Sequence, residues 1–583
     1  MRSALVILVL AAGCSMGADG GNTPDATNTS DAGPGDGGVQ GCAIGYDPMD
    51  PVASSVLPIR AFVNVVNPTG IPTYSWTVTR NSSPVAFTQQ AADGSQIGFI
   101  AATPGPYVVR ADITNVPFCS ETQTTINVEA PGANIEVFRL RTVPASSVPP
   151  QETLIQVKGG ADAVRPITLQ TGLDAIGFVK NSATSANIAA YLKFMPRSMP
   201  TAFSERFASS ATGYSLKLVP LDHDVLVIPG VAGLAPKLVT WTAFTTDLLV
   251  GPGNVTTGTV RGPSGAGFAG ANVQLYAGGV PSTSATTAAD GSYSVRSDFP
   301  TGATQITVKV TPPPGSGLPR LEATSAFNLA SALNVTYAAS LTTCDLANTP
   351  VRRGGVNQPN AQVNIVGGLA GVAGSIGGVN ATNSVRVSAT ADGAGQLPST
   401  LVPRGSLSAV TELSMSDHAI SAIDTSGCSV AQINAPAMTT INGTTRYPNN
   451  TAIGGVRAEA EPIGVLALAG VAPIQVVSNA SGAFALPLAG GGRYNVRFID
   501  PQQRVASLVA NDVATTGVPT NALMPKALAI SGTVTAGANL LLGASIQILC
   551  ATCLGLEAAR PIAETASDSV GKYLIAVPDP GTM

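Results

Sequence analysis

Asp222, His223 and Asp224 form the one local cluster of this sequence whose side chains could bind a divalent metal ion or transfer protons. Adjacent residues of a β-strand point to opposite faces of a sheet, so these three side chains converge only if the backbone bends. The alternating run Asp224–Ile228 is typical of a strand. We therefore interpret the cluster as a hairpin turn rather than a metal site.

The rest of the sequence offers little further catalytic chemistry. The second histidine, His418, lies in a different expected module, and no serine occupies a G-x-S-x-G elbow. The glycine-rich run Gly367–Gly378 lacks the Gly-Lys-Ser/Thr of a phosphate loop, and we interpret it as a low-complexity insert. We predict a protein that is not an enzyme and needs no metal ion or cofactor. Paired carboxylates, which sequence alone cannot bring together, are the open alternative.

Seven cysteines supply a second kind of chemistry. Cys14 follows Ala11-Ala12-Gly13, and before these residues lie Arg2 and an apolar run, Ala4–Leu10, that is too short to span a bilayer. A basic start, a short apolar core and small residues before a cut site are typical of a signal peptide. The run resembles a bacterial lipobox, which implies that residues 1–13 are removed and that Cys14 carries the lipid. A plain secretory signal with an incidental cysteine is the alternative.

The other six cysteines are an even set, which favours an oxidising compartment and disulfide bonds. The simplest of the possible pairings joins neighbours along the chain: Cys42 with Cys119, Cys344 with Cys428, and Cys550 with Cys553. The run from Cys550 to Cys553 could instead be a redox motif or half of a zinc site. It follows a strand pattern, Ser545–Leu549, and no second pair completes four zinc ligands, so a local disulfide or two inert thiols is favoured.

The composition predicts an all-β chain. Only 11% of the 583 residues are charged, against roughly 25% in an average soluble protein. The 63 glycines and 44 prolines are typical of many short strands joined by turns. The formal net charge of -4 gives no basic footprint for nucleic acid. Residues 14–41 contain almost nothing apolar and are expected to form a disordered tether behind the lipid.

One pattern recurs after residue 250. Each copy has an opening glycine, alternating strands, a tight turn that ends in glycine, and an aromatic residue two positions later that should enter a sandwich core. The opening glycines are Gly258, Gly443 and Gly532, the turn glycines are Gly291, Gly482 and Gly571, and the aromatic residues are Tyr293, Phe484 and Tyr573. The pattern resembles carboxypeptidase regulatory-like domains, which implies small transthyretin-like sandwiches that act as spacers or binding modules.

The segment before the repeats predicts two further sandwiches. Residues 42–130 carry the strand patterns Tyr74–Val78 and Tyr107–Ile113, and they resemble a PKD or immunoglobulin-like domain with Trp76 in its core. Cys42 is expected before the first strand, with its disulfide at one end of the sandwich. Residues 131–250 form a second sandwich, in which Ala186–Met195 is either a short helix or an edge strand.

The expected organisation is therefore a lipidated disordered tether followed by tandem immunoglobulin-like or transthyretin-like β-sandwiches. Its boundaries are a signal peptide at 1–13, the tether at 14–41, sandwiches at 42–130 and 131–250, repeats at 251–342 and 438–526, a divergent repeat with a glycine-rich insert at 343–437, and an incomplete repeat at 527–583. The last copy ends before the strand that corresponds to Ile306–Val310. We interpret it as a truncated repeat, and an open sheet edge is the alternative.

As a whole the chain is similar to the large modular lipoproteins of myxobacteria. This resemblance implies a cell-envelope protein, anchored to the outer membrane through the lipid on Cys14 and facing the periplasm or the cell surface. We predict a structural or adhesive role in which the modules bind polysaccharide, peptidoglycan or an envelope protein, and do not bind nucleic acid. An accessory subunit of an envelope secretion or degradation assembly is the alternative.

Overall fold

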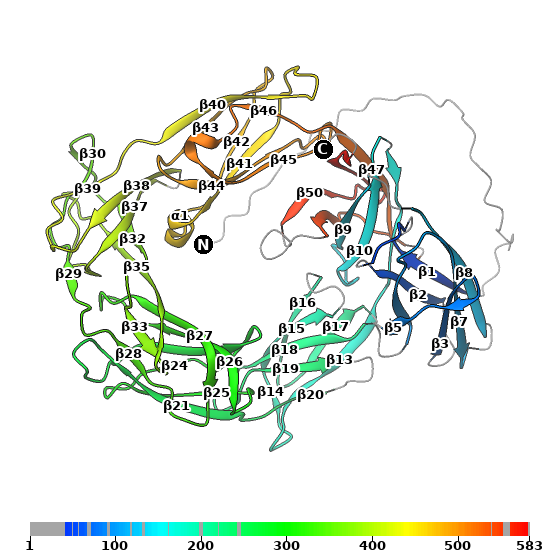
Figure 1. Cartoon of the computed structure of the whole chain (residues 1–583), viewed down its shortest axis with the longest axis horizontal. Coiled ribbons are helices and arrows are strands. Elements are labelled where there is room, and N and C mark those ends of the chain that lie inside the picture. The colour runs from blue at the N-terminus through cyan, green and yellow to red at the C-terminus, as the bar shows by residue number, and fades with distance from the viewer. Residues whose placement is uncertain are drawn as a thin grey trace.

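The protein is all-β, and its modules follow one another around a ring (Figure 1). The computed structural model describes residues 41–48, 51–55, 58–66, 72–89, 94–116, 119–130, 135–160, 162–197, 202–219, 221–241, 247–414, 416–537, 539–551 and 560–580. In these ranges the one α-helix is α1 (Val465–Ala469), beside one 3-10 turn, Thr515–Gly517. No helix of the described residues is long and apolar enough to cross a membrane.

Six strands recur in the same order in most modules of the ring. In the module 254–337 they are β21 (Asn254–Arg261), β22 (Asn272–Ala277), β25 (Ser292–Ser297), β26 (Ala303–Thr311), β27 (Arg320–Asn328) and β28 (Val335–Tyr337). The first strand pairs with the third, and the second, fourth and fifth form the other sheet. The last strand pairs in parallel with the first, and we call it the return strand.

The same order is found before and after this module. In 173–250 the strands are β13 (Leu173–Asn181), β15 (Ala190–Pro196), β17 (Tyr214–Leu218), β18 (His223–Pro229), β19 (Lys237–Trp241) and the return strand β20 (Asp247–Val250). In 439–523 they are β40 (Thr439–Arg446), β41 (Arg457–Ile463), β43 (Ala483–Leu488), β44 (Arg493–Ile499), β45 (Leu508–Ala514) and the return strand β46 (Asn521–Leu523). The segment that the sequence left as helix or edge strand, 186–195, includes most of β15, which is an inner strand between β16 (Ser204–Ala208) and β18.

The turn and aromatic features of the repeat have the geometry that the sequence predicts. Gly291, Gly482 and Gly571 have positive φ, which glycine adopts without steric cost. Tyr293, Phe484 and Tyr573 are buried. In the last module the Asp568 carboxylate accepts bonds from the amides of Val570 and Lys572, which closes the turn.

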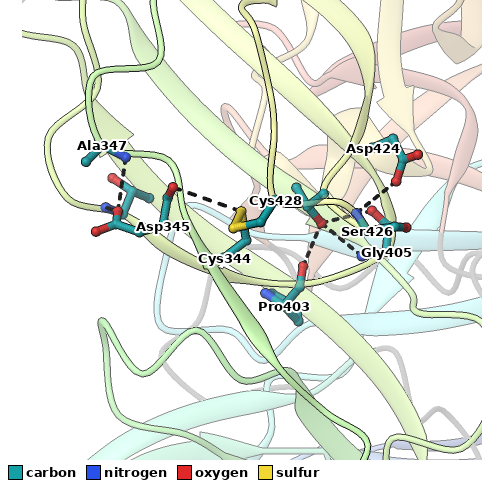
Figure 2. The surroundings of a disulfide bond; sticks show 10 residues. Cys344, Asp345, Ala347, Pro403, Gly405, Asp424, Ser426 and Cys428 are labelled. Carbon is teal, nitrogen blue, oxygen red and sulfur yellow. Dashed lines mark hydrogen bonds between the residues drawn. A yellow bond between two sulfur atoms is a disulfide. The ribbon is translucent and has the colours of Figure 1, made fainter.

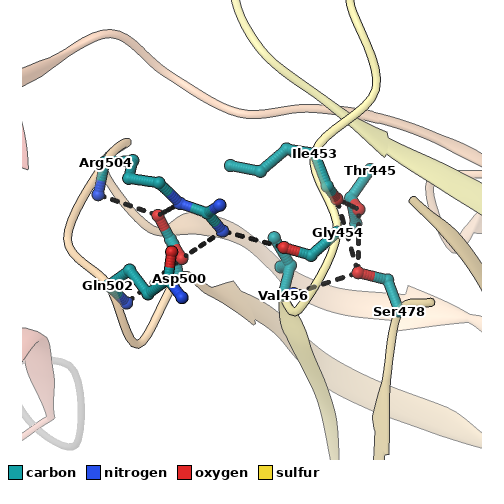
Figure 3. Close-up of polar contacts among 8 residues, drawn as sticks. All are labelled: Thr445, Ile453, Gly454, Val456, Ser478, Asp500, Gln502 and Arg504. Carbon is teal, nitrogen blue, oxygen red and sulfur yellow. Dashed lines mark hydrogen bonds and ion pairs between the residues drawn. The ribbon is translucent and has the colours of Figure 1, made fainter. Parts of the chain in front are cut away.

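A buried hydroxyl next to this turn holds each sandwich together. In Figure 3, Ser478 Oγ accepts a bond from the Val456 amide, and Thr445 donates to the Ile453 carbonyl. Thr287 and Ser567 occupy the equivalent place in two other modules, where they accept bonds from the amides of Ala271 and Ala544. Each bond satisfies a backbone amide that the core would otherwise bury without a partner.

The last module is built from both ends of the chain. Residues 527–578 supply β47 (Ala527–Ala536), β49 (Ser545–Cys550), β50 (Pro561–Ala566) and β51 (Lys572–Pro578), and residues 135–169 supply β9 (Ile135–Val143), β10 (Gln151–Lys158), β11 (Ala163–Val164) and β12 (Ile167–Leu169). Strand β9 pairs with β49, and β11 and β12 pair in parallel with β47. Figure 1 shows cyan β9 and β10 beside orange-to-red β47 and β50. We call this sandwich the closure module.

Residues 163–169 act as the return strand of the closure module. A Cβ at Gly532 would lie 2.2 Å from the Arg165 carbonyl oxygen, just as one at Gly258 would lie 2.1 Å from that of Leu333. The Tyr573 hydroxyl donates to the Arg165 carbonyl, and the Tyr293 hydroxyl donates to that of Leu333. The opening glycine therefore leaves room for the backbone of the return strand, and the aromatic hydroxyl forms a hydrogen bond with it.

Two of the expected modules, 131–250 and 527–583, do not match the sheets. Residues 135–169 belong to the same sandwich as 527–578, and not to the one formed by 173–250. The segment 527–583 does lack its final strands, as the sequence indicates, but its edge is not open, because strands from residues 135–169 pair with it. One core joins the two segments: Phe138, Leu140 and Ile167 pack with Ile530, Ile546 and Ile575. Hydrophobic periodicity marks each strand but carries no information about pairing between strands some 400 residues apart.

The module 343–434 is the divergent one. Its strands include β30 (Val351–Arg353), β32 (Gln362–Gly367), β35 (Thr382–Thr390), β37 (Ser406–Ser414), β38 (Asp417–Asp424) and the return strand β39 (Ile433–Asn434). The glycine-rich insert is ordered, contrary to the low-complexity interpretation. Its residues Gly374–Ile376 form β33, which pairs with β28 of the preceding module and adds Ile376 to that module's core.

A disulfide joins Cys344 to Cys428 and so links the two ends of this module (Figure 2). The neighbouring loops are fixed by short carboxylate contacts, in which Asp345 accepts a bond from the Ala347 amide and Asp424 accepts one from the Ser426 amide. The bond closes a loop 84 residues long, so it restricts the unfolded chain far more than the folded one.

The N-terminal module, 41–130, lies outside the ring and packs against the closure module. Its two sheets have the strand orders β1-β2-β6-β5 and β4-β3-β7-β8. The strands are β1 (Gly41–Asp47), β2 (Pro58–Val66), β3 (Thr73–Arg80), β4 (Ser83–Pro84), β5 (Phe87–Gln89), β6 (Gln96–Ile100), β7 (Gly105–Thr114) and β8 (Glu121–Val128). Trp76 is in the core and donates from Nε1 to the Gly94 carbonyl. Cys42 is bonded to Cys119, but Cys42 lies within the first strand and not before it, because β1 begins at Gly41.

Closure of the ring can be tested by cross-linking. Val143 and Ser545 are register partners in β9 and β49, so cysteines at these positions should oxidise to one intramolecular disulfide. We expect the Val143→Cys/Ser545→Cys chain to migrate faster than wild type on a denaturing gel without reductant. A control pair, Val143→Cys with Ser294→Cys, should not cross-link, because Ser294 belongs to a different module. Cross-linked dimers, or equal reaction of both pairs, would contradict the closed ring.

Candidate functional site

The cluster that opened the sequence analysis is not brought together. The His223 ring is buried against Trp241, with centroids 5.5 Å apart, and its Nδ1–H donates to the Leu221 carbonyl. Asp224 is on the opposite face of β18, where its carboxylate forms an ion pair of 2.8 Å with Arg197. The residues that the structure describes contain no group of three His, Cys, Asp or Glu side chains arranged to hold a metal ion.

The remaining predicted site residues are distributed as follows. Cys14 lies outside the described residues, so its lipidation stays a prediction. Cys550, at the end of β49, is disulfide-bonded, and its expected partner Cys553 is also outside the described residues. His418, the second histidine, is buried, and burial lowers its pKa.

A polar groove of about 580 Å³ lies where the modules 254–337 and 343–434 meet. Strand β27 of the first module pairs with β35 of the second, so one sheet of nine strands runs through both. The groove crosses the solvent-facing side of β22, β26, β27 and β35, which are green to yellow-green in Figure 1. Twelve residues line it: Asn272, Gln274, Tyr276, Lys309, Val310, Thr311, Arg320, Leu321, Glu322, Thr382, Asn383 and Ser384.

One row of groove residues is already satisfied by contacts within the protein. In register across the four strands it consists of Gln274, Lys309, Glu322 and Thr382. Lys309 Nζ lies 3.5 Å from the Glu322 carboxylate and 5.1 Å from the ring centroid of Tyr276. The Tyr276 hydroxyl donates to Gln274, and Thr382 donates to the Glu322 carbonyl. This first row therefore gives the floor of the groove a fixed shape.

The neighbouring row has no such partners. It consists of Asn272, Thr311, Arg320 and Ser384, one residue from each of the same four strands. Asn272 is opposite Thr311 and Arg320 is opposite Ser384, while Thr311 and Arg320 extend the β26–β27 register by one position. Within the described part of the chain, no hydrogen bond or ion pair engages these four side chains. We call them the free row.

The free row offers an amide, two hydroxyls and a guanidinium at the spacing of adjacent strands, roughly 4.8 Å. Such groups donate and accept hydrogen bonds but include no nucleophile with a neighbouring base, so the row is suited to binding. A ligand with many hydroxyls could replace the water on this row without leaving polar groups unpaired.

A second cavity, of about 360 Å³, lies between the N-terminal module and the closure module. It is lined by apolar and aromatic side chains, including Tyr46, Phe62 and Leu154. Beside it, buried Glu152 forms an ion pair of 3.6 Å with Arg139, whose Nε donates to the Cys550 carbonyl. Burial raises the pKa of Glu152, and the surrounding arginines oppose that shift. The charged groups Glu152 and Arg139 pair with each other within the joint, and we assign this cavity no ligand.

Sequence reasoning missed the groove. The signal was the set of polar residues that alternate with apolar ones in Ala271–Leu275 and Ile306–Val310, which marks the outer face of a strand. This alternation alone could not identify a site, because the groove forms only when β27 pairs with β35 of the next module.

No protein-family model matches the chain, and no curated protein sequence matches it. Among solved structures the chain is similar to the Bacillus anthracis TIE protein, a streptococcal ancillary pilin and a SusE-like surface located polysaccharide binding protein from Bacteroides thetaiotaomicron. The TIE protein is 12% identical, the match covers 69% of this chain and 75% of that one, and the TM-score is 0.13. For the pilin the values are 12%, 47%, 99% and 0.15, and for the polysaccharide binding protein they are 8%, 83%, 98% and 0.14. At these scores the likeness carries no argument about function.

The buried histidine predicts a pH dependence. Burial lowers the pKa of His223 to about 4, below the ordinary value of 6.5. Between pH 6.5 and pH 4 the histidine is therefore protonated in the unfolded chain but not in the folded module. The free energy of unfolding of this module is highest above pH 6.5 and decreases as the pH falls towards 4. Between pH 7 and pH 4.5 the cost is about 2 kcal/mol.

We expect His223→Asn, which keeps a donor for the Leu221 carbonyl but does not titrate, to remove most of this loss. Denaturant unfolding followed through Trp241 fluorescence in a Trp76→Phe background reports on this module alone, because the chain has two tryptophans. His418→Asn is the control and should leave the Trp241 transition unchanged. Equal pH dependence in His223→Asn and the parent would contradict the assignment.

Proposed function

We propose that this protein is a lipid-anchored envelope protein that binds polysaccharide through the groove between the modules 254–337 and 343–434. The free row is the observation that carries the proposal. Its four side chains hold hydrogen-bonding capacity that the protein does not use, on a sheet whose first row is held rigid by its own contacts. A sugar chain is suited to bind such a row because each of its hydroxyl groups both donates and accepts hydrogen bonds.

The anchor in this proposal is the lipid on Cys14. Residues 15–40 would then separate the folded modules from the membrane, with the N-terminal module between the tether and the ring. The groove begins at Asn272, more than 230 residues after the tether, so membrane attachment and ligand binding use separate parts of the chain. This arrangement supports a structural or adhesive role on the envelope, facing the periplasm or the cell surface.

Glycan binding through the groove is tested with the full mature chain on an array of purified bacterial envelope polysaccharides. We expect at least one glycan to bind, and Asn272→Ala with Ser384→Ala to weaken it roughly thirtyfold, since two lost hydrogen bonds cost about 1 kcal/mol each. The matched control is Thr257→Ala with Ser294→Ala, an exposed register pair on the other sheet of the same module. Equal binding by both double variants, or no glycan bound while one envelope protein co-purifies stoichiometrically, would contradict the proposal.

Lipidation is tested separately. The wild-type chain, expressed in a bacterium that acylates exported proteins, should partition into detergent and have a mature N-terminus at a modified Cys14. Cys14→Ser should remove both properties, because a lipid contributes about 0.8 kcal/mol of membrane affinity for each buried CH₂. Cys344→Ser is the control and should not change partitioning. A free, unmodified N-terminus on the wild-type protein would contradict this part of the proposal.

A further inference from the structure

The two rows of the groove differ in charge. In the first row the Lys309 ammonium is paired with the Glu322 carboxylate, so their charges cancel. Glu322 is the one acidic residue among those that line the groove in the described part of the chain. The free row contains Arg320 and no acidic side chain, so the guanidinium charge is not neutralised by the protein.

The surroundings of Arg320 favour an anion over a second protein segment. Arg320 is exposed, and its neighbours in the row are the Thr311 and Ser384 hydroxyls, with the Asn272 amide beyond Thr311. A guanidinium is planar and presents paired N–H donors, which match two oxygens of one anionic group. The hydroxyl groups on either side are suited to the neighbouring oxygens of a sugar and offer no apolar surface to a peptide side chain.

We infer that the groove selects an acidic glycan, with Arg320 binding the anionic group of one sugar while Asn272, Thr311 and Ser384 bind hydroxyls of the chain. This inference rests on the proposed polysaccharide binding and adds the class of ligand. Carboxylate and sulfate groups share the chemistry that Arg320 recognises, so the ligand is a sugar chain that carries either one. Lys309, the other cation that lines the groove, is neutralised by its ion pair with Glu322. Arg320 is therefore the residue that decides the selectivity.

The test compares charged and neutral forms of the same sugar chain. Polygalacturonate and its fully methyl-esterified form differ only at the carboxyl group, which the ester makes neutral, and dextran sulfate and dextran differ only in the sulfate. We expect the full chain to bind at least one charged member roughly tenfold to a hundredfold more tightly than its neutral partner, with a preference that weakens as salt is added.

Arg320→Ala should remove this preference, and Arg320→Lys should retain part of it because the charge remains without the planar fork. Arg261→Ala, which removes an exposed arginine from β21 in the other sheet of the same module, is the matched control and should have no effect. Circular dichroism establishes that each variant keeps its all-β fold.

Two results overturn the inference and separate it from the proposed function. Equal binding of charged and neutral chains, weakened by Asn272→Ala but not by Arg320→Ala, leaves glycan binding in place and removes the selectivity. If Arg261→Ala reduces the charge preference as much as Arg320→Ala does, the preference is a property of the whole surface, and this result also overturns the inference. If no member of either pair binds and the array is also negative, both the inference and the proposed function fail.

Discussion

The pairing of β9 with β49, and of residues 163–169 with β47, is the interaction on which the ring depends. Every module of this kind needs a return strand beside its first strand and a fourth strand beside its second. A chain of such modules in a line would leave these edges open at its end, and open edges pair with other chains. Here the missing half of the last module was synthesised some 400 residues earlier, and the edge is covered within the same molecule.

A second pairing between modules fixes where the groove lies. The junction between 254–337 and 343–434 is made by a continuous sheet rather than by a flexible linker. The β27–β35 pairing brings Arg320 opposite Ser384, two residues that belong to different modules. The insert strand β33 strengthens the same junction, because it pairs with β28 and places Ile376 in the neighbouring core. A site shared between modules therefore has the rigidity of a site within one.

The sequence predicted the local parts of this structure and missed the long-range ones, for physical reasons that differ. The turn glycines and Tyr293 were identified because φ and burial are set by neighbours in the chain. Two of the three expected disulfides, Cys42–Cys119 and Cys344–Cys428, were identified because each pair of cysteines brackets one module. The partner of β49 was not identified, because strand pairing over such a distance leaves no trace in periodicity. The insert at 374–376 was taken for low complexity because its glycines, which let the backbone approach β28 closely, look the same as those of a flexible segment.

The free row is compatible with a stable fold because it remains in water. A buried polar group without a partner costs about 1 to 3 kcal/mol, but an exposed one is satisfied by solvent, so the four side chains impose no such cost on folding. Their backbones are held by the sheet, so a ligand has to order only side chains, and Arg320 loses the most rotamer freedom of the four. In the first row the polar groups are engaged with one another, since Lys309 contacts both Glu322 and the Tyr276 ring. Preorganisation of this kind is what allows a shallow, exposed sheet face to bind an extended chain.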